Sequence, residues 1–353
     1  MNILYILPSL ANTAPISIAY HLVDACIKEG FNVEVAYFDN IKGLVFPCHT
    51  YQIKMQDVIN FEKYDIIHSH MRRPDKYIAM HKKEITCAKT ISTIHCDIFE
   101  DLKYAYGKTI AYIYTNLWIN NLKKFDYTIQ VSEFLVKKYN VYFKKNILIH
   151  NGVQIYEYNF NNDDYTEIKE KIDEYHLNNY KIILSYSNIN KRKGLQQILN
   201  TLIYREDLAY ICIGNGKELK KLEKKVYNLH LNKRVSFFPF IFAPYNLVPY
   251  IDVVVIPSYS ESFCLALHEA GMMKARIVCS NIPAFKDAFN ELEVCFFELD
   301  NTKSLLQAIS DALSYNRGIN IEKKERRNYT MAIMQNNYIS LYKKITEKSN
   351  LDE

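Results

Sequence analysis

The chain has 353 residues, of which 49% are hydrophobic and 24% are charged, and its formal net charge is +5. This length exceeds what one ordinary core accommodates, so we expect two domains, and the composition excludes a disordered chain. The mild positive charge does not indicate a nucleic-acid-binding protein, which usually has a clustered basic stripe, so no nucleic-acid partner is expected.

The pattern of cysteines and the N-terminal residues indicate the cellular compartment in which the protein is expected. The eight cysteines are scattered and include no Cys-x-x-Cys pair, which argues against a zinc site and a disulfide framework. Residues 1–8 lack the basic region and the length of a secretory signal, and no stretch reaches the roughly 18 apolar residues of a membrane span. A reducing cytoplasm is therefore the expected setting.

Apolar strands and amphipathic helices alternate through the first half. A strand at 3–7, a helix at 16–29 that stops at Gly30, and a strand at 31–37 form a βαβ unit. Further strands are predicted at 65–68, 90–94, 127–131 and 147–149. Alternation of this kind is typical of a doubly wound parallel sheet.

The alternation stops at Asn151-Gly152, and a polar, acidic segment follows at 156–166. It then resumes with a strand at 181–186, a helix at 194–204, strands and helices at 209–213, 217–229, 234–237, 252–256, 264–273 and 276–279, and final helices to about residue 346. The sequence thus predicts two Rossmann-like domains, one over 1–155 and one over 156–330.

The most informative stretch is the turn and helix at 258–271, which follows the apolar strand at 252–256. In open α/β sheets, ligands bind at the carboxyl ends of strands. The start of the helix offers the backbone N–H groups of Phe263, Cys264 and Leu265 without partners inside the helix, and the helix dipole adds positive potential. This combination suits a phosphate.

Two glutamates, Glu261 and Glu269, bracket this turn and are separated by seven residues. Because like charges repel, their carboxylates are better suited to accepting hydrogen bonds from sugar hydroxyls than to binding the same anion. Two hydroxyl-binding carboxylates beside a phosphate-binding turn indicate a nucleotide-sugar site. Two exposed glutamates on a surface helix are the plainer interpretation, and only the agreement of other segments outweighs it.

Two further loops follow strands of the second half. The segment at 187–194 places Lys191, Arg192 and Lys193 where a cation could pair with a diphosphate as charge leaves the sugar, although a solvated basic turn is an equally weighted interpretation. The glycines at 214–216 permit close backbone approach, but a plain turn is the better interpretation of a lone Gly-x-Gly.

Histidines end two strands of the first half. His95 is expected to look across a cleft at the Glu261 turn, where it would give a sugar a polar contact or a backbone carbonyl; a satisfied interfacial histidine is the alternative. His68 and His70 share one face at a strand end and could ligate a metal. No third ligand stands at a recognisable spacing, so no metal site is expected.

Aromatic and basic residues are mixed in the segment at 103–124. This mixture fits an interfacial helix that rests on a membrane. It also fits a helix packed on the sheet by its aromatic face, which is the interpretation we favour.

Taken in order, these segments resemble the retaining glycosyltransferases of family 4, which have the GT-B fold of two Rossmann-like domains facing across a cleft. The motifs that carry the resemblance are Glu261-x7-Glu269, Asn151-Gly152-Val153, Val131-Ser132-Glu133 and Lys193-Gly194. The likeness extends over most of the chain. It implies an acceptor-binding N-terminal domain, a C-terminal domain that binds a nucleotide sugar, and a last helix within 331–353 that crosses back to the first domain.

The resemblance also implies roles for single residues. Lys193 would bind the donor diphosphate, Glu269 the ribose hydroxyls, and Glu261 with the backbone of 263–265 the donor sugar and the distal phosphate. His95 aligns with a histidine beside the transferred sugar, so the implied catalytic residues are His95, Lys193 and Glu261. No metal or other cofactor is implied, and the leaving phosphate helps to deprotonate the acceptor on the same face of the sugar, with retention at the anomeric carbon.

The chain departs from the family pattern in its loops. Asn188 stands where an arginine is usual, so Lys191 or Arg192 would have to replace that cation. Ser262 and Cys264 replace two glycines, which is tolerable if their φ angles are ordinary.

Two more departures concern the base and the acceptor side. Pro239 replaces a customary glycine before Phe240-Ile241, whose backbone contacts the base in the family. The acceptor-side loop with Asn12, Thr13 and Ala14 stands where a glycine pair is usual. The complete donor-binding set that we expect is Asn188, Lys193, Gly214, Ile241, Glu261, Ser262, Phe263, Cys264, Leu265 and Glu269.

The sequence thus predicts a cytoplasmic enzyme that moves a hexose-type sugar from a nucleoside diphosphate to a glycan or lipid-linked acceptor, in surface polysaccharide or lipopolysaccharide synthesis. A UDP-sugar is preferred as the donor over a GDP-sugar, and peripheral contact with the inner face of the plasma membrane is a further expectation. Two alternatives stay open: a nucleotide-sugar epimerase of the same architecture and a non-catalytic, nucleotide-binding GT-B protein.

Overall fold

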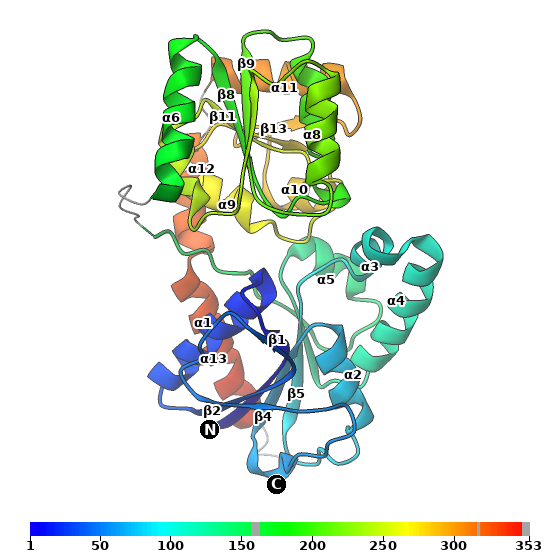
Figure 1. The fold of residues 1–353 in the computed structure, drawn as a ribbon. Helices are drawn as coiled ribbons and strands as arrows, with labels where there is room; N and C mark the ends of the chain where they lie inside the picture. The colour runs from blue at the N-terminus through cyan, green and yellow to red at the C-terminus, as the bar shows by residue number, and fades with distance from the viewer. Residues whose placement is uncertain (157–162, 316–317, 348–353) are drawn as a thin grey trace. The chain divides into compact units, whose positions relative to one another are not determined.

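The computed structural model describes residues 1–156, 163–315 and 318–347. The chain divides into two compact units (Figure 1). The first unit comprises Met1–Gly152 and the C-terminal helix that begins at Met331, and the second comprises Val153–Thr330. The polar segment expected at 156–166 lies partly outside the described residues. The last six residues of the chain lie wholly outside them.

The first unit is built on a seven-stranded sheet of order β3-β2-β1-β4-β5-β6-β7, and its described strand pairings are parallel. Its elements are β1 (Asn2–Leu10), α1 (Ala14–Lys28), β2 (Asn32–Lys42), β3 (His49–Gln52), the 3-10 turn η1 (Phe61–Lys63), β4 (Ile66–His70), α2 (Arg72–Met80), β5 (Lys89–Ile94), α3 (Ile98–Tyr106), α4 (Lys108–Leu122), β6 (Tyr127–Gln130), α5 (Glu133–Tyr139), β7 (Asn146–Leu148) and α13 (Met331–Glu347).

Both faces of this sheet are buried, which is why its central strand reads as a continuous apolar run. Ile3, Tyr5 and Leu7 of β1 pack with α1 and α13 on one face. Leu4 and Ile6 point to the opposite face and pack with α2. Each aliphatic side chain buried in this way contributes about 1.5–3 kcal/mol to folding.

The C-terminal helix α13 is an integral part of the first unit. Tyr342 of α13 shares a 2.8 Å hydrogen bond with the Tyr5 hydroxyl and one of 2.6 Å with Nδ1 of His68. A Cβ atom added to Gly152 would lie 2.5 Å from Cα of Met331, so the chain and the helix pass each other too closely for any side chain at that position. The Asn151-Gly152 motif therefore has a packing reason.

The second unit contains a six-stranded parallel sheet of order β10-β9-β8-β11-β12-β13. Its elements are α6 (Asp163–Leu177), β8 (Lys181–Tyr186), η2 (Lys191–Lys193), α7 (Gln196–Leu202), β9 (Leu208–Ile213), α8 (Leu219–Asn228), β10 (Val235–Phe238), η3 (Pro244–Tyr250), β11 (Val253–Ile256), α9 (Leu265–Met272), β12 (Ile277–Ser280), α10 (Pro283–Ala288), β13 (Cys295–Phe297), α11 (Thr302–Ser314) and α12 (Gly318–Asn328).

Alternate residues of β8 again serve two buried faces. Ile182 and Leu184 pack with α6 and α9, whereas Ile183 packs with α7, α8 and α11. The prediction of two doubly wound, Rossmann-like α/β domains is confirmed.

One expectation about a helix is wrong. The segment at 103–124 was expected to pack on the sheet by its aromatic face, but Tyr106, Tyr112 and Tyr114 are exposed. The inner side of α4 is formed instead by Ala111, Trp118, Ile119 and Leu122, which are buried. Small and aliphatic side chains, with the tryptophan, fill that interface, so the tyrosines are left outside.

Candidate active site

The candidate site of the second unit lies where β8 and β11 end. These two strands are neighbours in the sheet, with Ile183 opposite Val253, so the loops that follow them start side by side. Gly194 closes the first loop with φ +64°, and a Cβ atom there would lie 2.1 Å from the carbonyl oxygen of Pro257 in the second. Glycine is therefore required for the two loops to meet.

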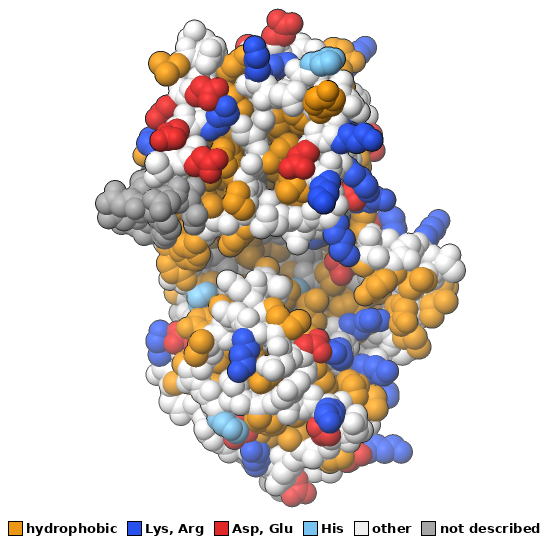
Figure 2. All heavy atoms as spheres, in the orientation of Figure 1, with side chains coloured by type: hydrophobic (Ala, Val, Ile, Leu, Met, Phe, Trp, Pro, Cys, Tyr) orange, Lys and Arg blue, Asp and Glu red, His pale blue; other side chains and the backbone are white. Residues whose placement is uncertain are grey.

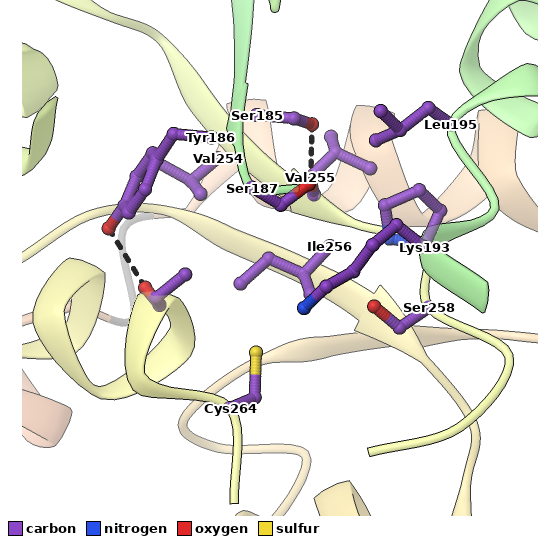
Figure 3. A pocket seen from close by; sticks show the side chains of 12 residues that line it. Ser185, Tyr186, Ser187, Lys193, Leu195, Val254, Val255, Ile256, Ser258 and Cys264 are labelled. Carbon is purple, nitrogen blue, oxygen red and sulfur yellow. Dashed lines mark hydrogen bonds between the residues drawn. The ribbon is translucent and has the colours of Figure 1, made fainter. Parts of the chain in front are cut away.

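A pocket with about 290 Å³ of empty space, part of it open to solvent, lies between these strand ends and the start of α9. Figure 3 shows the ammonium of Lys193, the hydroxyl of Ser258 and the thiol of Cys264 directed into the same space. The Tyr186 hydroxyl donates a 2.9 Å hydrogen bond to the carbonyl of Ala266 and so ties the end of β8 to the first turn of α9 (Figure 3).

Lys193, Arg192 and Glu261 form an ion cluster at this pocket. The Lys193 ammonium donates to Oε1 of Glu261 at 2.7 Å, and Nη1 of Arg192 donates to Oε2 at 3.1 Å and to the Ser260 carbonyl at 2.8 Å. The Glu261 side chain is only 5% exposed. Burial alone would raise the pKa of Glu261, but the two cations outweigh burial and hold that pKa at about 2.

The structure therefore brings together Lys193 and Glu261, which are 68 positions apart in the sequence and belong to two separately predicted segments. It also shows which cation of this loop could replace the arginine that the family usually has at the position of Asn188. Asn188 is exposed and accepts a 3.4 Å hydrogen bond from Asn190, Lys191 is exposed, and Arg192 is the side chain that reaches Glu261.

Glu269 lies one turn into α9 and is partly exposed. Burial raises the pKa of Glu269 to about 7. No ion pair joins Glu269 to another residue of the described chain, so nothing there offsets the cost of its charge.

The turn before α9 is strained at one residue. Cys264 has φ +66°, in the left-handed region that favours glycine, whereas Ser262 is not among the described residues of positive φ. The condition under which these two replacements are tolerable, an ordinary φ angle, is therefore not met at Cys264. Phe263, beside it, stacks on His268 with ring centroids 3.9 Å apart, and Leu265 begins the helix.

His268 is fixed in turn by a buried partner. Its Nδ1 lies 2.7 Å from Oε2 of Glu325 on α12, and both side chains are fully buried. This pair anchors the ring on which Phe263 stacks, so it supports the turn at the start of α9, whose Cys264 lines the pocket.

Gly214 and Ile241 occupy structural positions. A Cβ atom added to Gly214 would lie 1.9 Å from the Ser187 carbonyl oxygen, so this glycine permits approach to the loop that follows β8. Ile241 is buried in the core, so only its backbone could contact a ligand.

A model of the family described as "Glycosyl transferases group 1" matches residues 167–331. The O-antigen biosynthesis glycosyltransferase WclY of Escherichia coli is 30% identical to the chain over 329 residues, which are 88% of this chain and 89% of WclY. The chain belongs to the group 1 glycosyl transferases. This finding confirms the glycosyltransferase prediction at the level of the family.

Solved structures of glycosyltransferases share the fold of this group 1 glycosyl transferase. A sucrose-phosphate synthase from Thermosynechococcus elongatus gives a TM-score of 0.81 at 16% identity and covers 99% of this chain and 100% of its own. HepE of Anabaena, solved in complex with UDP-glucose, gives a TM-score of 0.78 at 14% identity, with coverage of 98% and 100%. At such identities the likeness concerns the fold, and the GT-B prediction is confirmed.

The histidines predicted for the first unit of this glycosyltransferase form a chain of rings. Nε2 of His95, at the end of β5, lies 2.8 Å from Nδ1 of His70, which is fully buried. The pKa of His95 is lowered to about 3 by burial, so its ring is neutral at pH 7 and acts as a hydrogen-bonding group rather than a cation. His68 uses Nδ1 on Tyr342 and Nε2 on Thr93, the latter at 2.9 Å.

The tautomer of His95 follows from its neighbour. Nε2 of His70 is buried without a hydrogen-bond partner. Because a buried N–H without a partner is rarer than a bare acceptor, the proton of His70 belongs on Nδ1, from which it is donated to Nε2 of His95. His95 then carries its own proton on Nδ1. In the parts of the chain that the structure describes, no group of three or more His, Cys, Asp or Glu side chains could hold a metal.

The loop that we predicted on the acceptor side lies at the carboxyl end of β1 in the first unit. Asn12, Thr13 and Ala14 are exposed, and α1 begins at Ala14. The loop is tightly supported, because a Cβ atom on Gly43 would lie 2.6 Å from the Asn12 backbone nitrogen.

Sequence reasoning missed the small polar residues that line the pocket. Ser187 directly follows β8, Ser258 follows β11 after Pro257, and both serines line the pocket. A search for small polar residues that end buried strands could have found them, since that is where open α/β sheets bind ligands.

Proposed function

We propose that this glycosyltransferase transfers a hexose from a UDP-sugar to a glycan or lipid-linked acceptor in the synthesis of a surface polysaccharide such as O-antigen. WclY, named as an O-antigen biosynthesis enzyme, and HepE, solved with UDP-glucose, support this assignment. The observation that carries it is the ion cluster of Lys193, Arg192 and Glu261 at the pocket of the second unit.

Lys193 and Arg192 bind the donor diphosphate in this proposal. The diphosphate takes over part of the positive charge that Glu261 neutralises in the free protein, and the amides at the start of α9 bind the distal phosphate. Arg192 serves as the second cation that the sequence lacks at Asn188. Stabilising the charge that develops on the leaving diphosphate is the main contribution of this cluster to catalysis.

The two glutamates bind hydroxyl groups. Once the diphosphate holds the cations, Glu261 accepts hydrogen bonds from the donor sugar. Glu269 accepts them from the ribose in its ionised form, which is half populated near pH 7 because its pKa is raised to about 7.

We infer that transfer proceeds with retention and without a metal, as in family 4. The acceptor oxygen bonds to the anomeric carbon on the face from which the phosphate oxygen departs, the electrons of the breaking bond go to the diphosphate, and a phosphate oxygen takes the acceptor proton. Neutral His95 donates a hydrogen bond to the transferred sugar, and the loop of Asn12, Thr13 and Ala14 lies on the acceptor side.

The test uses purified protein with a panel of UDP- and GDP-sugars and a lipid-linked glycan acceptor. We expect nucleoside diphosphate release with one UDP-hexose, and a loss of at least a hundredfold in kcat/KM for Lys193→Ala and for Glu261→Ala. Lys191→Ala is the control, because Lys191 is exposed in the same loop. Unchanged turnover in Lys193→Ala and Glu261→Ala would refute the site.

The same experiment separates the alternatives. Conversion of the donor sugar in buffer without an acceptor would identify an epimerase. Nucleotide binding without turnover of any donor would identify a binding protein. The NMR coupling of the anomeric proton in the product tests retention.

A further inference from the structure

The outer side of α4 carries an apolar surface that the transfer reaction does not explain. Figure 2 shows hydrophobic side chains gathered over this helix, at the right of the view. The surface consists of side chains that are each 40–68% exposed: Ile110, Tyr112, Ile113, Tyr114 and Leu117 of α4, together with Tyr106 at the end of α3. We call these six residues the α4 apolar surface. Contiguous apolar surface on a folded protein commonly marks an interaction site.

The helix that presents this surface is firmly attached to the first unit. Trp118 is buried and its indole N–H donates a 2.6 Å hydrogen bond to the buried carboxylate of Asp75. The Ser69 and Ser92 hydroxyls donate to the other oxygen of Asp75 at 2.6 and 2.8 Å. The apolar side chains are therefore held outward by a well-anchored helix.

Lysines dominate the charge of the segment that carries the α4 apolar surface. Residues 102–125 contain four lysines and no acidic residue. Lys103 is paired with Glu100 at 2.7 Å, whereas Lys108 and Lys123 lie exposed at the two ends of the helix. The guanidinium of Arg72 lies 4.6 Å from the ring centroid of Tyr114 and adds a further cation at the edge. A partner for this surface should be apolar with a negative rim.

We propose that the α4 apolar surface rests on an anionic lipid bilayer. Isoleucine and leucine side chains would enter the boundary of the acyl chains, tyrosine rings would lie at the level of the headgroups, and lysines would meet lipid phosphates. No helix among the described residues is long and apolar enough to cross a membrane, so the contact is one that lies on the surface.

A second copy of the chain fits this surface less well. A two-fold dimer through α4 would set the same surface against itself, and its unpaired lysines would meet like charges. The lipid proposal goes beyond the proposed transfer reaction and does not depend on it. The α4 apolar surface belongs to the first unit, to which the proposed function assigns the acceptor, and this suits a lipid-linked acceptor.

The test is co-sedimentation of the protein with lipid vesicles. One set of vesicles contains phosphatidylcholine alone, and the other contains about one phosphatidylglycerol in three lipids, whose negative charge attracts basic segments. We expect binding to the anionic vesicles that weakens with salt. The double variant Ile113→Ser, Leu117→Ser should lower the partition coefficient at least tenfold. The control is Leu177→Ser, which removes an exposed leucine at the end of α6 in the second unit.

A second variant tests the electrostatic part. Lys108→Gln with Lys123→Gln should weaken binding to anionic vesicles by about fivefold for each lysine and leave binding to neutral vesicles unchanged. All variants should keep the wild-type melting temperature, because the altered side chains are exposed. The absence of vesicle binding, equal binding by the serine variant and the wild type, or a dimer in sedimentation equilibrium that the serine variant abolishes would overturn the proposal.

Discussion

Replacing Glu261 by glutamine removes the shared counterion of Lys193 and Arg192. The pKa of Glu261 falls from an ordinary 4.5 to about 2, and each pKa unit corresponds to about 1.4 kcal/mol. Its ionised form therefore stabilises the second unit by about 3 kcal/mol, and little of this is screened by solvent because the side chain is 5% exposed. Breaking a buried pair by removing one partner costs a similar amount, about 3–5 kcal/mol.

The sign of the pH dependence follows from the lowered pKa. The stabilisation is complete above pH 4.5 and is lost as the pH falls through 2, so the wild type should lose roughly 1 kcal/mol of it by pH 3.5. Glu261→Gln should be destabilised by about 3 kcal/mol at pH 7 and should lack this portion of the acid dependence.

Urea unfolding at pH 7 and pH 3.5, followed by far-ultraviolet circular dichroism, measures both quantities. Tryptophan fluorescence would not suffice, because the single tryptophan, Trp118, belongs to the first unit. The control is Glu206→Gln, which alters an exposed glutamate of the second unit. Equal free energies of unfolding for the two variants would refute the reasoning about the cluster.

The affinity for UDP should change in the opposite direction to the stability of Glu261→Gln. Removing the carboxylate takes away a negative charge beside the diphosphate, so Glu261→Gln should bind UDP about tenfold more tightly, while sugar transfer falls.

Three further predictions concern single residues. The affinity of the wild type for UDP should fall as the pH drops below 7, because protonated Glu269 cannot accept both ribose hydroxyls, and Glu269→Gln should flatten this dependence in calorimetric titrations across pH 6–8. Cys264→Gly should keep the melting temperature within about 3 °C, because the relief of left-handed strain offsets the lost thiol contacts, whereas Cys264→Val should lower the free energy of unfolding by about 2 kcal/mol or more. His70→Leu should reduce kcat at least tenfold with KM for the donor little changed, and His70→Asn, whose amide nitrogen can replace Nδ1 as the donor to His95, should restore most of it.

The elements with long apolar periodicity could be predicted from the sequence, and short or polar ones could not. β1, α1, β8 and β11 fall within a few residues of their predicted ranges, because each buries an apolar run or face. β3 is a partly exposed edge strand of four polar and aromatic residues, and β13 has three residues, so neither leaves a clear pattern.

The candidate site shows the same limit. The Glu261 turn could be placed from local signals, because a strand, a turn and a helix follow one another there. The contact of Glu261 with Lys193 depends on strand order, which brings β8 beside β11 although β9 and β10 lie between them in the chain. The positive φ of Cys264 depends on the path of the backbone between two packed elements, and the residue type does not predict it.

Calorimetric titration of UDP into the wild type, Lys193→Ala and Lys191→Ala tests the central claim most directly. Both lysines belong to the same short turn, but only Lys193 is directed into the pocket. We predict that UDP binds the wild type and Lys191→Ala equally, and that Lys193→Ala binds at least tenfold more weakly, since a charged hydrogen bond contributes about 1.5–3 kcal/mol. Equal affinity of all three proteins, or no UDP binding by the wild type, would contradict the account.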